Sequence, residues 1–102
     1  MKKYKTAIGK IVELTEERKN YFLTKHPELK PHFPKIKTVL SKPAEIRLSK
    51  RDGRVLLFYK FFDKILGGKY IVVVVKINSR NFIITVHITD KIKAGRKYEK
   101  ES

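Results

Sequence analysis

The chain of 102 residues contains no cysteine. This absence excludes disulfide frameworks, thiolate nucleophiles and cysteine-based zinc sites, and it suits a reducing compartment. Long apolar runs are missing as well, since the longest, residues 70–75, is much too short to span a bilayer. The charged residues after Met1 are not followed by the apolar stretch of a signal peptide. We therefore expect a cytoplasmic protein that does not enter a membrane.

Acidic residues are scarce, with 10 Asp and Glu against 25 Lys and Arg and a formal net charge of +15. Self-repulsion at this charge opposes a compact state, so the charge points to a polyanionic partner. Nucleic acid is the commonest such partner, because neutralising its phosphates releases condensed counterions. An anionic membrane surface is the weaker alternative, because it requires an amphipathic basic helix or a lipid anchor. We expect the partner to be RNA.

Several motifs of enzyme sites are also absent. No glycine-rich loop precedes a Lys-Ser or Lys-Thr pair, so a nucleotide cradle is not indicated. No serine stands in a nucleophile elbow, and no acidic pair suggests glycoside hydrolysis. His26, Glu28 and His32 are close in sequence, but the prolines between them fit no regular metal geometry. We expect neither a metal nor a cofactor.

The residues that are present predict one α+β domain. A hydrophobic fraction of 41% with eleven Phe and Tyr residues can fill one core, and the length does not allow two. We expect an ordered core over residues 6–92 and a basic tail over residues 93–102. Helices are predicted to pack on one face of a four-stranded antiparallel sheet, or a five-stranded one if residues 6–14 form a strand.

Start and stop signals delimit the elements. Thr15 can cap a helix whose first turn carries Glu16 and Glu17, and Pro27 ends it near Lys25 with His26 at its C-terminus. The pattern then predicts, in order, a second helix over residues 34–40 and strands over residues 44–50, 55–62, 70–77 and 82–89. Turn signals at residues 51–54 and 67–68 separate the strands.

The last hairpin can be predicted residue by residue. A tight turn at Ser79-Arg80 pairs Asn78 with Asn81 and fixes the register. One face is then wholly apolar and must be core: Ile71, Val73, Val75, Ile77, Phe82, Ile84, Val86 and Ile88. The other face is mixed, and is either solvated or a site: Tyr70, Val72, Val74, Lys76, Ile83, Thr85, His87 and Thr89.

Histidine on such a cationic, hydroxyl-rich face could serve RNA cleavage. The 2′-hydroxyl of RNA attacks the adjacent phosphate if a base takes its proton, an acid protonates the leaving oxygen and cations stabilise the transition state. His87 on the last strand and His26 at a helix C-terminus are the candidates. The ordinary alternatives stay open: a solvated or paired histidine for His87, and a helix cap for His26.

For several other side chains the sequence also allows either an ordinary structural role or a contact with nucleic acid. Arg47 is either an ordinary outward strand residue or a phosphate contact. Arg18, Tyr21 and Lys25 share one helical face, which is either solvated or a binding stripe. Tyr59 and Phe61 more often pack in a sheet than stack against bases.

The ordered motifs of residues 12–93 resemble a known group of small domains. Thr15-Glu16-Glu17-Arg18 and Lys25-His26-Pro27-Glu28-Leu29 are similar to the opening "ER..HI...HPE" of phage- and mobile-element-associated domains, and Lys-Pro-Ala-Glu-Ile-Arg, Leu-Phe-Tyr-Lys, Tyr-Ile-Val-Val-Val-Val-Lys and Phe-Ile-Ile-Thr-Val-His-Ile-Thr follow in the same order. That group has the barnase, EndoU, colicin-nuclease and RelE-like fold, and its members are predicted metal-independent ribonucleases. The resemblance implies the same α+β fold here, and it implicates Arg18, His26, Arg47, Lys76 and Thr85. The chain departs from the pattern at Tyr21, where the group often has histidine.

Taken together, these features predict a small endoribonuclease of toxin type. We expect His26 and His87 to transfer protons, with Arg47 and Lys76 also at the catalytic centre. The expected nucleic-acid contacts are Arg18, Tyr21, Lys25, Tyr59, Thr85 and Thr89. Two alternatives remain: a non-catalytic RNA- or DNA-binding module, and a basic protein neutralised by an acidic partner such as an antitoxin.

Overall fold

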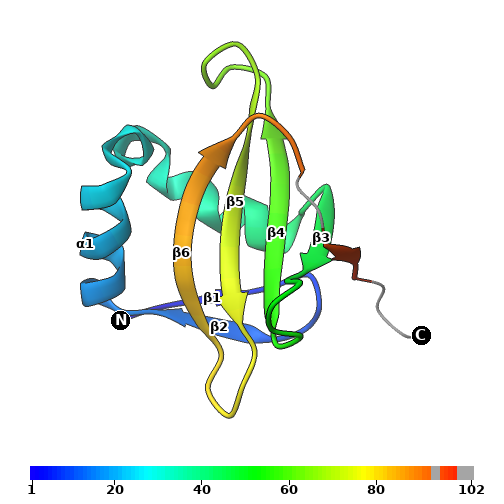
Figure 1. Cartoon of the computed structure of the whole chain (residues 1–102). Coiled ribbons are helices and arrows are strands. Elements are labelled where there is room, and N and C mark those ends of the chain that lie inside the picture. The colour runs from blue at the N-terminus through cyan, green and yellow to red at the C-terminus, as the bar shows by residue number, and fades with distance from the viewer. Residues whose placement is uncertain (93–94, 99–102) are drawn as a thin grey trace.

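A computed structural model describes residues 1–92 and 95–98 of the chain, and Figure 1 shows how its strands and helices are arranged. The elements in chain order are β1 (Lys2–Lys5), β2 (Ile11–Leu14), α1 (Glu16–Lys25), the 3₁₀ helix η1 (Pro27–Lys35), α2 (Ile36–Ser41), β3 (Glu45–Leu48), β4 (Val55–Phe62), β5 (Lys69–Lys76), β6 (Phe82–Thr89) and β7 (Arg96–Lys97). The predicted α+β class is confirmed.

The seven strands of the described residues join one sheet in the order β1-β2-β6-β5-β4-β3-β7. Neighbouring strands are antiparallel except β2 and β6, which pair in parallel through Glu13 and Phe82. The sheet is therefore mixed and has more strands than the four or five antiparallel ones that were predicted.

The single strand predicted over residues 6–14 is wrong, because a turn divides this segment. The backbone N–H and the hydroxyl of Thr6 both donate to the carbonyl oxygen of Lys10, at 2.9 and 2.7 Å. Gly9 adopts a φ of +81° in this turn, a backbone conformation that glycine reaches at little cost. The chain preceding the turn forms β1, which pairs with β2 at one edge of the sheet. Its lysines discourage pairing with another chain.

The other edge of the sheet is formed by the C-terminal segment. Residues 93–94 and 99–102 of the predicted basic tail lie outside the described residues, whereas residues 95–98 include β7, which pairs with β3. Gly95 has a φ of +145°, and a Cβ at this position would sit 2.6 Å from the carbonyl oxygen of Leu48. Glycine is therefore required where the chain joins β3.

Helix α1 matches its prediction, and the second helix does not. The backbone N–H of Arg18 donates to Thr15 Oγ1 at 3.2 Å, and α1 ends at Lys25. The second helical region begins at Pro27, as the 3₁₀ helix η1, and becomes α-helical only from Ile36. Prolines inside η1 carry no N–H to donate, which favours a 3₁₀ arrangement over a regular α-helix there.

The β5–β6 hairpin follows the predicted register for most of its length. Pairs from Tyr70 with Thr89 to Val74 with Thr85 are as expected, but Val75 then pairs with Ile83 because of a bulge. Ile83, predicted on the mixed face, is therefore completely buried in the core. The predictions that Phe82 and Ile84 belong to the core are wrong, and Phe82 pairs with Lys76 of the opposite face. A bulge of this kind inserts one extra residue and shifts the alternation of faces.

The helices cover one face of the sheet. Helix α2 packs behind β4 and β5, and α1 packs against β6 (Figure 1). The core between helices and sheet consists of Val12, Leu14, Phe22, Leu29, Ile36, Val39, Leu40, Leu56, Phe58, Ile65, Ile71, Val73, Val75, Ile83 and Val86. The opposite surface of β3 to β6, here called the outer face, carries Arg47, Leu57, Tyr59, Phe61, Tyr70, Val72, Val74, Lys76, Thr85, His87 and Thr89.

Candidate functional site

His26 and His87 lie side by side. Their ring centroids are 6.1 Å apart, with an angle of 39° between the ring planes. The two residues are 61 positions apart in the sequence, so the fold alone brings them together. Both side chains are partly exposed.

The alignment of α1 with β6 explains this meeting. Thr15 at the start of α1 and Phe82 at the start of β6 line the same cavity of about 290 Å³. From there, eleven helical residues to His26 rise about 16 Å, and five strand residues to His87 advance about the same distance. The C-terminus of α1 therefore reaches the level of His87.

His26 is held at the end of α1 by its backbone and its side chain. Its backbone N–H donates to the carbonyl oxygen of Phe22 at 2.8 Å, which makes it the C-terminal cap of the helix. Its Nδ1 lies 3.5 Å from Glu28 Oε1. A carboxylate at one ring nitrogen orients an imidazole, so that the other nitrogen is the one that exchanges protons with a ligand. Sequence reasoning considered Glu28 only as a metal ligand and missed this contact.

His87 stands on the outer face between two threonines. Its cross-strand partner on β5 is Val72, which is fully buried, and Thr85 and Thr89 flank it on the same side of β6. The Thr89 hydroxyl donates to the carbonyl oxygen of Lys91 at 3.4 Å. The predicted grouping of His87 with Thr85 and Thr89 is confirmed.

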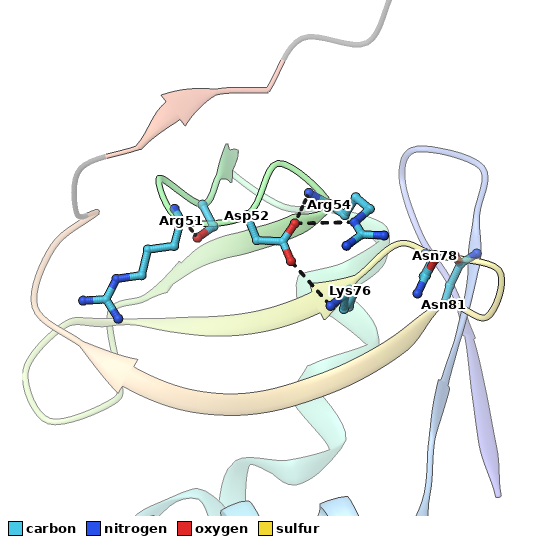
Figure 2. A network of polar contacts seen from close by, with 7 residues as sticks. Arg51, Asp52, Arg54, Lys76, Asn78 and Asn81 are labelled. Carbon is cyan, nitrogen blue, oxygen red and sulfur yellow. Dashed lines mark hydrogen bonds and ion pairs between the residues drawn. The ribbon is translucent and has the colours of Figure 1, made fainter.

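Lys76 lies away from the histidines. It is four residues along β5 from Val72, the partner of His87, which is about 13 Å along the strand. Its Nζ is 3.4 Å from Asp52 Oδ2, and Figure 2 shows Asp52 between Lys76 and Arg54. The prediction that Lys76 lies beside the histidines is therefore wrong.

Asp52 organises this second cluster. Its Oδ1 accepts a hydrogen bond of 2.9 Å from the backbone N–H of Arg54 and lies 3.6 Å from Nε of the same residue (Figure 2). The backbone hydrogen bond is the main reason why the pKa of Asp52 is lowered from its usual range; partial desolvation opposes this, and the cations of Lys76 and Arg54 lower the pKa further. The carboxylate closes the turn before β4.

Replacing Asp52 with asparagine should cost stability only where the carboxyl is ionised. Because folding lowers the pKa of Asp52, its stabilising contribution is present above the unfolded pKa and is lost as pH falls through the folded pKa. Urea midpoints of wild type and Asp52→Asn should therefore differ slightly at about pH 7, and the difference should shrink as the pH falls below the usual pKa range of aspartate. A difference that does not change with pH would contradict this role of the charge.

Arg47 is engaged at the other edge of the outer face. It forms an ion pair with Glu45, and its Nη1 donates to the carbonyl oxygen of Gly95 at 2.8 Å. Leu57 and Val74 separate it from Thr85 in the row across the sheet, a distance of about 14 Å for three strand spacings. Arg47 thus connects the C-terminal segment to β3. It was expected at the catalytic centre, but it lies far from the histidine pair.

The predicted helical stripe is present on α1. Tyr21 is 50% exposed, and Arg18 Cζ and Lys25 Nζ lie 5.8 and 5.7 Å from the centroid of its ring. Cations at this distance are attracted to the face of an aromatic ring. The stripe places two cations on the helix that carries His26.

Tyr59 differs from its predicted role as a nucleic-acid contact. Only 2% of it is exposed, so a base cannot stack on its ring. The sequence analysis favoured sheet packing for this residue on general grounds, and Tyr59 packs edge-to-face against Tyr70 with centroids 6.2 Å apart. It therefore belongs to the support of the outer face.

Within residues 1–92 and 95–98, no group of three or more His, Asp or Glu side chains is arranged to hold a metal ion. No helix in this part of the chain is long and apolar enough to cross a membrane.

Comparisons with models of protein families, with curated proteins and with solved structures found no match to this chain.

Proposed function

We propose that the protein is a metal-independent endoribonuclease of toxin type. The observation that carries the proposal is the approach of His26 and His87 to 6.1 Å between ring centroids in a chain of net charge +15. The charge supplies attraction for a polyanion. The two imidazoles supply the pair of proton-transfer groups that RNA cleavage needs.

The chemistry requires no group beyond the RNA and the side chains. The 2′-hydroxyl attacks the adjacent phosphorus, one histidine takes the hydroxyl proton, and the other donates a proton to the departing 5′-oxygen. A new bond forms between the 2′-oxygen and phosphorus while the bond to the 5′-oxygen breaks. The products are a 2′,3′-cyclic phosphate and a 5′-hydroxyl. Imidazoles this close both come within hydrogen-bond reach of a single phosphate.

We propose that the side chains that bind the RNA phosphates come from α1 and not from the sheet. Lys76 and Arg47 are engaged with Asp52 and Glu45, and both lie far from the histidines. Arg18 and Lys25 are exposed on the helix that holds His26. We assign Lys25, next to His26, and Arg18, about 10 Å farther along the helix axis, to binding phosphates of the RNA backbone on one side of the scissile phosphate.

Incubation of the pure protein with labelled RNA in the presence of EDTA tests this function. We expect cleavage into fragments with cyclic phosphate ends, because no metal takes part in the reaction. Single-stranded DNA of the same sequence should stay intact, since it lacks the attacking 2′-hydroxyl. RNA that remains intact at micromolar enzyme would remove the catalytic part of the proposal.

A second candidate is a nucleic-acid-binding module without catalysis. The engagement of Lys76 and Arg47 by carboxylates favours it, because the transition state would then lack the two sheet cations that the sequence predicted.

Both candidates predict binding that depends steeply on salt. A protein that contacts six or more phosphates loses about 10³-fold or more in affinity between about 50 and 200 mM salt. Fluorescence anisotropy with a labelled oligonucleotide over this range measures the slope. Binding that does not change with salt would rule out a contact dominated by phosphates, and with it both candidates.

We propose a RelE- or barnase-like fold with added edge strands, a cytoplasmic location suited to a chain without cysteine, and an acidic antitoxin as protein partner.

A further inference from the structure

Three aromatic rings gather on the outer face beside the histidine pair. Tyr70 on β5 packs edge-to-face with both of its β4 neighbours, at 6.2 Å from Tyr59 and 5.2 Å from Phe61 between centroids. The rings differ in exposure: Tyr59 is 2% exposed, whereas Phe61 is 48% exposed. Phe61 is thus the ring of this cluster that a ligand can reach most easily.

The position of Phe61 is fixed from two sides. The edge-to-face contact with Tyr70 holds one side, at an angle of 70° between the rings. On another side Phe61 Cζ lies 2.8 Å from the place where a Cβ on Gly68 would be, and Gly68 has a φ of +116°. Any side chain at position 68 would therefore displace the ring. The Phe61 ring is thus half exposed and bounded on two sides.

The register gives the position of this ring relative to His87. Phe61, Tyr70 and Thr89 form one row across the sheet, and Tyr59, Val72 and His87 form the next row on the same face. Phe61 is two strand spacings from β6, about 10 Å, and two residues along the strand, about 7 Å. A ligand that spans a few nucleotides reaches from His87 to Phe61.

We propose that Phe61 is a stacking platform for an unpaired nucleobase of single-stranded RNA. The inference rests on the proposed function and adds its substrate class. A base can stack on a protein ring only when it is splayed out of a helix, whereas duplex RNA offers mainly its backbone and hydroxyls. The charge of +15 argues for a polyanion over an apolar protein segment as the occupant.

The test measures binding separately from cleavage. The probe is a labelled 2′-O-methyl RNA of about ten nucleotides without self-pairing, which lacks the attacking hydroxyl, together with a duplex of the same sequence. Phe61→Ala should weaken single-strand binding about 5- to 100-fold and leave duplex binding nearly unchanged. Phe61→Trp should keep the affinity, and Phe61→Leu should lose most of it, because leucine fills the space without a π face.

Ile11→Ala is the matched control. Ile11 is 56% exposed on β2, at the other end of the sheet, and its removal should change neither probe's affinity. Thermal melting of each variant establishes that it is folded. Equal binding by wild type and Phe61→Ala, or equal losses for both probes, would overturn the inference. Failure of the wild type to bind any RNA would instead refute the proposed function. The experiment therefore distinguishes a wrong role for Phe61 from a wrong proposed function.

Discussion

Replacing His26 or His87 with alanine is expected to slow RNA cleavage about 10²- to 10⁴-fold. Each substitution removes one of the two groups that transfer protons, while the cations of α1 that attract RNA remain. The affinity for RNA should therefore change little. Because the pair acts as a unit, the double variant should be about as slow as the slower single variant.

The rates are to be measured in single turnover with excess enzyme, in EDTA, on one labelled RNA. His32→Gln is the control, since His32 lies in η1 and takes no part in the proposed chemistry. Its rate should match that of the wild type. If His26→Ala and His87→Ala cleave as fast as the wild type, the histidine pair has no catalytic role. If all variants bind RNA and none, including the wild type, cleaves it, the non-catalytic candidate replaces the enzyme.

Phe22→Ala is expected to lower the free energy of unfolding by about 3–5 kcal/mol. Phe22 is completely buried, and its ring stacks on Phe33 with centroids 6.5 Å apart. It is the buried anchor by which α1 holds to the core. Since total stability is typically about 5–15 kcal/mol, the loss would be a large part of it.

Tyr21→Ala tests whether this effect is local to the core. Tyr21 is next in sequence and half exposed, so its removal costs only exposed cation–π contacts and should change the unfolding free energy by about 1 kcal/mol or less. Urea unfolding followed by circular dichroism gives both values. A loss below about 1 kcal/mol for Phe22→Ala would mean that α1 is not anchored through this ring. Because His26 caps the same helix, a loosened α1 should also slow cleavage.

Local signals in the sequence predicted local structure well. The Thr15 cap and Pro27 fixed both ends of α1. The alternation in β5 predicted its two faces, and the turn predicted the register as far as Val74 with Thr85. Beyond that point Phe82, Ile83 and Ile84 are all apolar, so the pattern could not indicate which of them faces the core. The bulge depends on tertiary packing, and a run of apolar residues carries no pattern from which it could be predicted.

The edge strands were harder to predict for a different reason. β1 is four residues long and rich in lysine, and β7 has only two residues, so neither shows an alternating pattern. Their pairing depends on turns and on contacts with distant strands. The turn from Thr6 to Lys10 could have been suspected from Gly9, but a single glycine is weak support for dividing a strand.

The site was predicted in part. The face of His87 followed from alternation, and the end of α1 at His26 followed from proline, but their meeting depends on α1 lying along β6. Lys76 and Arg47 were assigned to phosphate because they are cations, and their carboxylate partners Asp52 and Glu45 emerge only from the turn and the strand geometry. Tyr59 was expected to contact nucleic acid and Phe61 was not, whereas Tyr59 is 2% exposed and Phe61 is 48% exposed.

The most direct test of the proposed cleavage mechanism uses an oligodeoxynucleotide that contains a single ribonucleotide. The protein is incubated with it in EDTA, and the new ends are identified. The proposed mechanism predicts one cut, on the 3′ side of that ribonucleotide, with a 2′,3′-cyclic phosphate and a 5′-hydroxyl. The His26→Ala, His87→Ala double variant should make this cut about 10²- to 10⁴-fold more slowly. Cleavage at deoxyribose positions, dependence on an added metal ion, or an unchanged rate in the double variant would contradict the mechanism.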